Sequence, residues 1–187
     1  LVPTGTPPAA RTGHCAGYDS ARDRIVVFGG NTGGLLRDVW VLTLTGTPAW
    51  TQLSPAGTLP AGRQNASAIY DPVGDRMLVF GGNTGSYLND VWSLGFSGTP
   101  TWTHLAPGGT APAGRALHTA VYDPVRQRMV VFAGWNGTTY YNDAWELTLG
   151  ATPAWNALAP TGTPPLARSG HVAVYDAGHD RMVIHGG

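Results

Sequence analysis

The stretch that decides the fold is Tyr70-Asp71-Pro72-Val73-Gly74-Asp75-Arg76-Met77-Leu78-Val79-Phe80-Gly81-Gly82. It predicts the end of one strand, a tight turn in which proline fixes φ, a second apolar strand and a double-glycine stop. The pattern returns at residues 18–30, 122–134 and 175–187, so its first tyrosine recurs after 52, 52 and 53 residues. A fixed period of this length indicates a repeat protein.

The composition is that of a folded chain with many turns. Of 187 residues, 27 are glycine and 15 are proline, and only 12 % are charged, against about 25 % in ordinary globular domains. Because 42 % of the residues are hydrophobic and seven are tryptophan, a disordered chain is excluded. All eleven basic residues are arginine and the net charge is zero, so no basic patch predicts nucleic-acid binding.

Three further features bound the prediction. No apolar run approaches the about 20 residues of a membrane-spanning helix, so we expect no membrane span. The single cysteine, Cys15, has no second cysteine with which to form an intrachain disulfide. Both ends of the sequence fall inside a repeat, which we interpret as a piece of a longer array.

Each repeat carries short apolar segments that predict strands. We name them A to D; in the first repeat they cover residues 14–18, 24–28, 38–44 and 49–53. Strand B is apolar at nearly every position, as expected for a strand that is buried on both faces. No segment shows sustained helical periodicity. We predict one segment over 1–187 with fourteen strands, divided into unit 1 (11–62), unit 2 (63–114), unit 3 (115–167) and a partial unit 4 (168–187).

The spacing of these strands favours one architecture. Four strands in about 50 residues, with both faces of each small sheet apolar, predict blades stacked face to face, as in a β-propeller. We therefore predict an all-β propeller segment of four-stranded antiparallel blades, about 3.5 in number. A solenoid of all-β units is the alternative.

The columns of recurring residues resemble the kelch repeat. Strand B ends in Gly81-Gly82, strand C carries Asn89-Asp90-Val91-Trp92, strand D carries the lone Trp102, and the next unit opens with Arg115 and then His118. Kelch units of about 50 residues form one four-stranded blade each. The variant is most similar to the galactose-oxidase central-domain type of bacterial extracellular proteins. This resemblance implies strands ordered A to D from the axis outward, and a secreted protein.

Nearly every charge of the chain lies in register. The ten aspartates fall at the end of strand A, in the AB turn and at the start of strand C, and two arginine columns recur with them. We interpret these columns as ion pairs that close turns or join blades. Three members of one column are also candidates to line a rim where a ligand would sit, namely Arg63, Arg115 and Arg168.

The histidines and the cysteine are interpreted as structural. His14, His118 and His171 share a column with Ala66, and each lies one blade away from the next, so they do not predict a metal site. Galactose-oxidase-like enzymes use a copper site with two tyrosines, two histidines and a tyrosine–cysteine cross-link, and no residue here matches that motif individually. Cys15 occupies a position where small residues recur. We predict no catalytic residue, no metal and no cofactor.

Aromatic residues separate into a repeating set and four exceptions. Six tryptophans form two columns that we predict to be inter-blade core: Trp40, Trp92 and Trp145 on strand C, and Trp50, Trp102 and Trp155 on strand D. The exceptions lie in the BC loops, Tyr87 in unit 2 and Trp135, Tyr140 and Tyr141 in unit 3. Trp135 aligns with asparagine in units 1 and 2, so the repeat gives it no structural role. Contact with a ligand and packing over its own blade are both open for it.

Antiparallel order places the BC loops and the DA loops, which join strand D to the next strand A, at one end of the molecule, the loop end. We predict a non-catalytic scaffold that binds a protein or a carbohydrate there, within a larger extracellular protein. The predicted contact residues are Trp135, Asn136, Tyr140, Tyr87, Arg37, Arg63, Arg115 and Arg168. Two alternatives stay open, a fragment of a galactose-oxidase-like copper-radical oxidase and a structural protein that self-associates through open blade edges.

Overall fold

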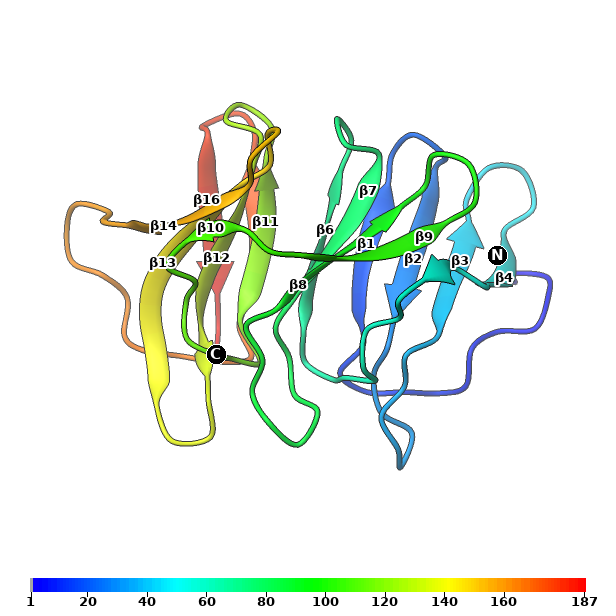
Figure 1. The fold of residues 1–187 in the computed structure, drawn as a ribbon, viewed down its shortest axis with the longest axis horizontal. Coiled ribbons are helices and arrows are strands. Elements are labelled where there is room, and N and C mark those ends of the chain that lie inside the picture. The colour runs from blue at the N-terminus through cyan, green and yellow to red at the C-terminus, as the bar shows by residue number, and fades with distance from the viewer. Residues whose placement is uncertain (1) are drawn as a thin grey trace.

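The structure of the protein is a computed structural model that describes residues 2–187, and strands are its only regular secondary structure over that range. Figure 1 shows the strands gathered into small sheets that lie side by side. The first sheet is fully antiparallel and has the order β1 (Cys15–Asp19), β2 (Arg24–Phe28), β3 (Val39–Thr43) and β4 (Ala49–Leu53). The predicted four-stranded antiparallel blade is confirmed.

The next two sheets repeat this meander. The second contains β6 (Ser67–Asp71), β7 (Arg76–Phe80), β8 (Val91–Gly95) and β9 (Thr101–Leu105). The third contains β11 (Thr119–Asp123), β12 (Arg128–Trp135), β13 (Tyr140–Thr148) and β14 (Ala154–Leu158). The fourth is an antiparallel hairpin of β15 (Val172–Asp176) and β16 (Arg181–His185). The predicted limits of the four units stay a prediction.

Two further strands bring the total over residues 2–187 to sixteen, where fourteen were predicted. They are β5 (Ala56–Gly57) and β10 (Gly108–Gly109), which pair in parallel with β9 and β14 of the following sheet. Thr4 makes the same parallel bridge to Ala49. The backbone of each of these proline-rich segments is therefore hydrogen-bonded to strand D of the next blade. Two-residue strands of alanine and glycine carry no alternation that a sequence pattern could reveal.

The innermost strand of each blade is strand A. Strands β1, β6, β11 and β15 are neighbours in that order, and together they line a central hollow of about 690 Å³. Four alanines face this crowded region from equivalent positions: Ala16, Ala68, Ala120 and Ala173. The predicted order of strands from the axis outward is confirmed, and the small side chains allow the blades to approach one another.

Adjacent blades are held together by aromatic cores. Between the first and second sheets the Phe28 ring lies 5.0 Å from that of Trp102, and between the second and third the Phe80 ring lies 4.9 Å from that of Trp155. Aliphatic residues from both facing sheets surround each pair, such as Val39 with Met77 and Val91 with Leu147. Two successive boundaries thus use the same packing, as expected for a repeat.

The tryptophan columns are core to different extents. Trp102 and Trp155 on strand D are buried, as is Trp92 on strand C. Trp40 and Trp145 are half-buried. In all three units the strand-C indole donates its Nε1–H to the aspartate two residues earlier, at 2.7 Å. Trp50 is half-buried because its face of the first sheet is covered by no other sheet of residues 2–187.

The aspartates at the ends of strands A close the AB turns. Asp71 Oδ1 accepts hydrogen bonds of 3.1 Å from the backbone N–H groups of Val73 and Gly74, and its Oδ2 accepts one of 2.9 Å from Arg76 Nε. Between turns, Arg22 forms a bidentate pair with Asp75 of the next blade, with both N–O distances 2.7 Å. The predicted turn-closing and blade-joining ion pairs are confirmed.

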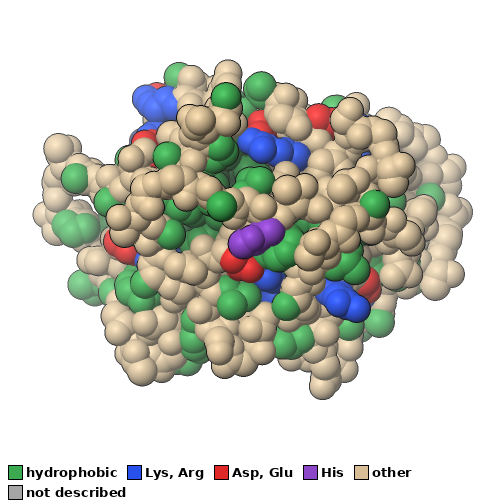
Figure 2. Space-filling view, in the orientation of Figure 1, with side chains coloured by type: hydrophobic (Ala, Val, Ile, Leu, Met, Phe, Trp, Pro, Cys, Tyr) green, Lys and Arg blue, Asp and Glu red, His purple; other side chains and the backbone are tan. Residues whose placement is uncertain are grey.

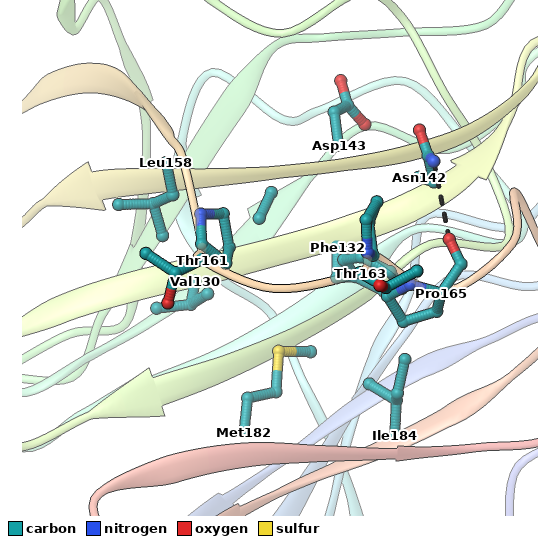
Figure 3. Close-up of a pocket in the computed structure, with 13 residues that line it drawn as sticks. Val130, Phe132, Asn142, Asp143, Leu158, Thr161, Thr163, Pro165, Met182 and Ile184 are labelled. Atoms are coloured by element: carbon teal, nitrogen blue, oxygen red, sulfur yellow. Dashed lines mark hydrogen bonds between the residues drawn. The ribbon is translucent and has the colours of Figure 1, made fainter.

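The third boundary is packed less fully. A cavity of about 360 Å³ separates the third sheet from the hairpin β15–β16 and is bordered on one side by the segment 160–165. In Figure 3, Met182 and Ile184 of β16 project toward the side where Val130 and Phe132 lie. Within the described residues Phe132 has no tryptophan neighbour like those of Phe28 and Phe80. This cavity occupies the place that strands C and D fill at the other boundaries.

Candidate functional site

Backbone hydrogen bonds join the DA loops in an open row at the loop end, which we call the backbone row. Asn65 N–H donates to Gly13 C=O at 2.6 Å, Leu117 N–H to Asn65 C=O at 3.0 Å, and Gly170 N–H to Leu117 C=O at 2.9 Å. All four residues have positive φ, between 57° and 70°. Because these residues occupy one column of the repeat, the hydrogen bonds join all four units and fix the floor of the loop end.

One residue of the backbone row, Leu117, has a strained backbone conformation. Leu117 has φ = 57°, a conformation that glycine adopts freely and that costs other residues about 1–2 kcal/mol. Ala133, at the end of the apolar part of β12, has the same φ of 57°. Both lie in unit 3, next to Trp135. Backbone strain of this kind clusters at functional sites.

The segment after strand B of unit 3 differs from the predicted loop. Strand β12 continues past a bulge after Phe132 to Trp135, and Trp135 pairs with Tyr140 at the start of β13. The one-residue insertion moves the turn-forming asparagine to position 136. Asn136 Oδ1 accepts hydrogen bonds from Thr138 and Thr139 N–H, as Asn83 Oδ1 accepts one from Gly85 N–H in unit 2. Trp135 therefore does not take part in the turn, whereas the asparagine at this register position in units 1 and 2 does.

Released in this way, Trp135 joins an aromatic cluster that we define as Tyr87, Trp135 and Tyr140. The Trp135 ring meets Tyr87 edge-on at 5.4 Å and stacks on Tyr140 at 6.0 Å. Tyr140 is 56 % exposed and the other two side chains are half-buried. Gly137 allows this contact between blades, because a Cβ atom there would lie 2.8 Å from the Tyr87 ring. The cluster therefore offers aromatic surface at the loop end.

A small pocket opens beside Tyr87 and Trp135. It has a volume of about 150 Å³, and its other lining residues come from the loops of units 2 and 3: Gln64, Asn65, Asn83, Ala116 and Leu117. We call it the amide pocket. Its carboxamide side chains can donate and accept hydrogen bonds, and the residues that line it carry no charge.

The predicted arginines do not join this site. Arg63 and Arg115 are 2 % and 0 % exposed, and each forms a bidentate ion pair, with Asp90 and with Asp143. Arg115 also lies 4.3 Å from the centre of the Tyr141 ring. The guanidinium beside each aspartate, aided by the hydrogen bond from the nearby tryptophan, lowers the aspartate pKa against the opposing effect of burial.

The other two predicted arginines are more accessible. Arg168 is half-buried and donates to Gly186 C=O at 2.8 Å, and Arg37 is exposed in unit 1, at the first sheet. Of the eight predicted contact residues, the structure brings together Tyr87, Trp135, Asn136 and Tyr140. Asn136 takes part through its Nδ2–H, which donates to Tyr141 Oη at 2.6 Å.

The buried histidines join neighbouring blades. His118 Nε2 lies 2.8 Å from Ser67 Oγ, and His171 Nε2 lies 2.7 Å from Thr119 Oγ1. Burial lowers the pKa of His118 to about 3, so it is neutral at physiological pH. Within residues 2–187 no three His, Cys, Asp or Glu side chains are grouped as a metal site would require. The absence of a metal stays a prediction.

Cys15 completes the same pattern in the first blade. It stands where Ser67 and Thr119 stand, and it faces Ala66 in place of a histidine. Burial raises the pKa of the Cys15 thiol to about 12, which leaves it protonated and a poor nucleophile.

The sequence prediction missed the amide pocket. Gln64, Asn65, Asn83, Ala116 and Leu117 all lie in columns that look unremarkable one at a time. The available signal was the change from Gln64 in unit 2 to Ala116 in unit 3 at one register position.

Among the described residues there is no helix with the length and apolar character to cross a membrane.

Several known proteins are similar to this chain over most of its length. Human host cell factor 2 is 28 % identical over 92 % of the chain, and the Caenorhabditis elegans host cell factor homolog hcf-1 is 33 % identical over all of it. The Xenopus laevis Rab9 effector protein with kelch motifs is 28 % identical, also over the whole chain. The chain spans 26 %, 25 % and 52 % of the length of these three relatives.

These relatives correct the predicted localisation, and they confirm the kelch resemblance without its predicted subtype. Secretion was predicted from the resemblance to bacterial extracellular units. It is contradicted by relatives that act inside cells. Among them are a Rab9 effector and a Drosophila melanogaster homolog of a leucine-zipper-like transcriptional regulator. The kelch resemblance is confirmed, whereas these matches give no support to the galactose-oxidase-like subtype.

A family model also identifies kelch repeats, and it matches the whole sequence. The KLHDC2/KLHL20/DRC7 Kelch-repeats domain matches residues 1–187. The resemblance to kelch repeats rested on the Asn-Asp-x-Trp stretch, the strand-D tryptophans and the arginine column. In the structure these residues form the blade cores and the bidentate ion pairs. The chain therefore belongs to the kelch-repeat family, as a domain of the KLHDC2/KLHL20/DRC7 type.

Proposed function

We propose that this chain is a non-catalytic kelch scaffold that binds a partner protein at its loop end. The observation that carries the proposal is the aromatic cluster, in which Tyr87 of one blade and Trp135 and Tyr140 of the next are in contact beside a small polar pocket. Large aromatic side chains with a polar neighbour are the residues that dominate protein interfaces.

The surroundings of the cluster support this role. The backbone row through Asn65 and Leu117 holds the loops in place, so little conformational entropy is lost when a partner binds. The nearby guanidinium groups of Arg63 and Arg115 are already paired with aspartates. A partner that relies on strong charge pairing would therefore gain little at the loop end. Figure 2 faces the side of the molecule on which the outer strands β9, β10 and β14 lie, and there too charged side chains are few and scattered. We expect a largely uncharged partner segment.

The relatives support the same class of function. Three of them, from frog, human and zebrafish, are named Rab9 effector proteins with kelch motifs, and an effector acts through contact with another protein. We extend protein binding as a class, and no particular partner, to this chain. Carbohydrate binding is the competing ligand class, because aromatic rings also stack on sugars.

A peptide-display library tests the proposal and separates these ligand classes. We expect the chain to enrich peptides whose binding weakens at least ten-fold in the variant Trp135→Ala/Tyr140→Ala. The matched control is Val73→Ala/Val125→Ala, which removes two exposed side chains from the AB turns at the opposite end and should leave binding unchanged. Peptides that bind both variants equally well would contradict the proposal. Binding to a glycan array without any peptide enrichment would replace it with carbohydrate recognition.

A second proposal is self-association through the last hairpin. Val172 and Val174 are 62 % and 61 % exposed on β15, and Val183 on β16 is also exposed. We propose that a second copy covers this apolar face, since exposed apolar strands favour pairing. Analytical ultracentrifugation should show dimers or larger species that Val174→Glu reduces. A monomer at high concentration would reject this role without affecting the first proposal.

A further inference from the structure

The amide pocket exists because one contact between blades is made at the first boundary and not at the second. Between units 1 and 2, Asn31 Nδ2–H donates a hydrogen bond of 3.1 Å to Gln64 Oε1. The residues that take these positions between units 2 and 3 are Asn83 and Ala116. The alanine side chain ends at Cβ, so among residues 2–187 no side chain accepts a hydrogen bond from Asn83 Nδ2.

The rest of the register is unchanged at the two boundaries. Asn83 pairs with Gln64 through its backbone as Asn31 pairs with Thr12, and its Oδ1 accepts from Gly85 N–H at 2.8 Å as that of Asn31 accepts from Gly33 N–H at 2.7 Å. The Asn83 side chain is therefore held in the same orientation. Its Nδ2–H donor is fixed, and the space that a glutamine side chain fills at the first boundary is open.

From this comparison we propose that the amide pocket binds a glutamine side chain of the partner protein. The partner's Oε1 accepts the hydrogen bond from Asn83 Nδ2 that Gln64 accepts from Asn31 at the first boundary. Tyr87 and Trp135 cover its aliphatic part. This inference rests on the proposed function, and it names the chemistry that the same site selects.

The size and the charge of the pocket favour this side chain. A volume of about 150 Å³ is smaller than the about 300–1,000 Å³ of pockets for whole small molecules, and it suits one side chain. A glutamate would lose its hydration without gaining a cation, because Arg63 and Arg115 are paired with their aspartates. A leucine would leave the Asn83 donor without an acceptor. Asn65 supplies a further carboxamide for the glutamine amide group.

Two variants and three probes test this inference on the intact chain. The probes are the N-acetyl N-methylamides of glutamine, glutamate and leucine, titrated to tens of millimolar against isotope-labelled protein. We expect the glutamine probe to shift the Asn83 side-chain amide and Trp135 indole signals, with at least ten-fold weaker effects from the other two. Ala116→Gln should abolish these shifts by filling the pocket from within. Asn83→Asp keeps the acceptor for Gly85 N–H and removes the donor, and in this variant the shift of the Trp135 indole signal should be abolished.

Each outcome has one reading. Equal responses to the glutamine and glutamate probes, no response to glutamine, or shifts that persist in folded Ala116→Gln or Asn83→Asp would overturn the inference. If the peptides selected at the aromatic cluster still bind Ala116→Gln, the inference fails and the proposed function stands. If the glutamine probe binds as expected but no selected peptide depends on Trp135, the proposed function fails and only a side-chain pocket remains.

Discussion

The interior of this protein and its loop end use the repeat differently. In the interior, the boundary between the first two blades and the boundary between the second and third are nearly the same, with Phe28 on Trp102 and Phe80 on Trp155. At the loop end the two boundaries diverge, since Asn31 binds Gln64 at the first while the second has Ala116, an open pocket and Trp135.

The difference teaches where the constraints on a repeat protein lie. A core position must fit two neighbouring blades at once, so its side chain recurs from unit to unit or, as where Cys15 and Ala66 replace Ser67 and His118, changes together with its partner. A loop position must fit only its own turn, and it can change provided that the turn survives. Asn136 keeps the turn of unit 3 intact one residue later, and that leaves Trp135 free to differ. Each prediction below changes one side of this comparison.

The largest effect is expected in the interior, from Trp102→Ala. Its side chain is 2 % exposed against Phe28, so its removal should lower the free energy of unfolding by about 3–5 kcal/mol. Trp50 is the matched control, because it holds the same strand-D position on a half-covered face, and its replacement by alanine should cost about 1–2 kcal/mol. Urea denaturation of both variants measures this. Equal losses would show that burial does not distinguish the two sites.

Arg115→Lys should have the second largest effect. Lysine cannot reproduce the bidentate pair with Asp143 together with the hydrogen bond to Ala133 C=O and the contact with the Tyr141 ring. We expect a loss of about 2–4 kcal/mol on thermal unfolding. Arg168→Lys changes the same column at a place where the guanidinium donates to the backbone carbonyls of Leu166 and Gly186, and should cost under about 1 kcal/mol. A tolerated Arg115→Lys would mean that the guanidinium fork is dispensable.

The histidine column predicts a pH dependence. The ordinary pKa of histidine is 6.5, and burial lowers that of His118 to about 3, so between these values the unfolded chain binds a proton that the folded chain does not. This contribution to stability is complete above pH 6.5 and declines as the pH falls toward 3, by about 2 kcal/mol at pH 5.

The first boundary supplies the control for this prediction. Ser67→Cys/His118→Ala copies the natural pair of Cys15 and Ala66, and should remove the His118 share of the decline between pH 7 and pH 5. His118→Ala alone leaves Ser67 Oγ without its partner and should cost about 1–3 kcal/mol at pH 7. An unchanged pH profile in the double variant would show that folding does not lower the pKa of His118.

These contrasts show how far the sequence could lead. The period of Tyr18, Tyr70, Tyr122 and Tyr175 was enough for the blades and most of the core, because core packing repeats with the chain. The strand order from the axis outward followed from the resemblance to kelch repeats. The parallel strands β5 and β10 could not be predicted, since their two residues carry no pattern and depend on the next blade. The register also indicated Trp135. It could not show that Arg63 and Arg115 are buried, because burial depends on how the loops close over them.

Apart from the control Arg168→Lys, the smallest effect on stability is expected from Trp135→Ala, together with the largest effect on binding. Its side chain is half-buried and contacts mainly Tyr87 and Tyr140. Each aromatic pair contributes about 0.5–1.5 kcal/mol, and because the site is partly exposed we expect a loss at the lower end for two pairs, about 1 kcal/mol. The backbone pairs of Trp135 with Ala116 and Tyr140 do not need the indole and should survive. Peptides selected by the loop end should lose at least ten-fold in affinity. A stability loss as large as that of Trp102→Ala would instead make Trp135 a core residue, and the loop end would then follow the same rule as the interior.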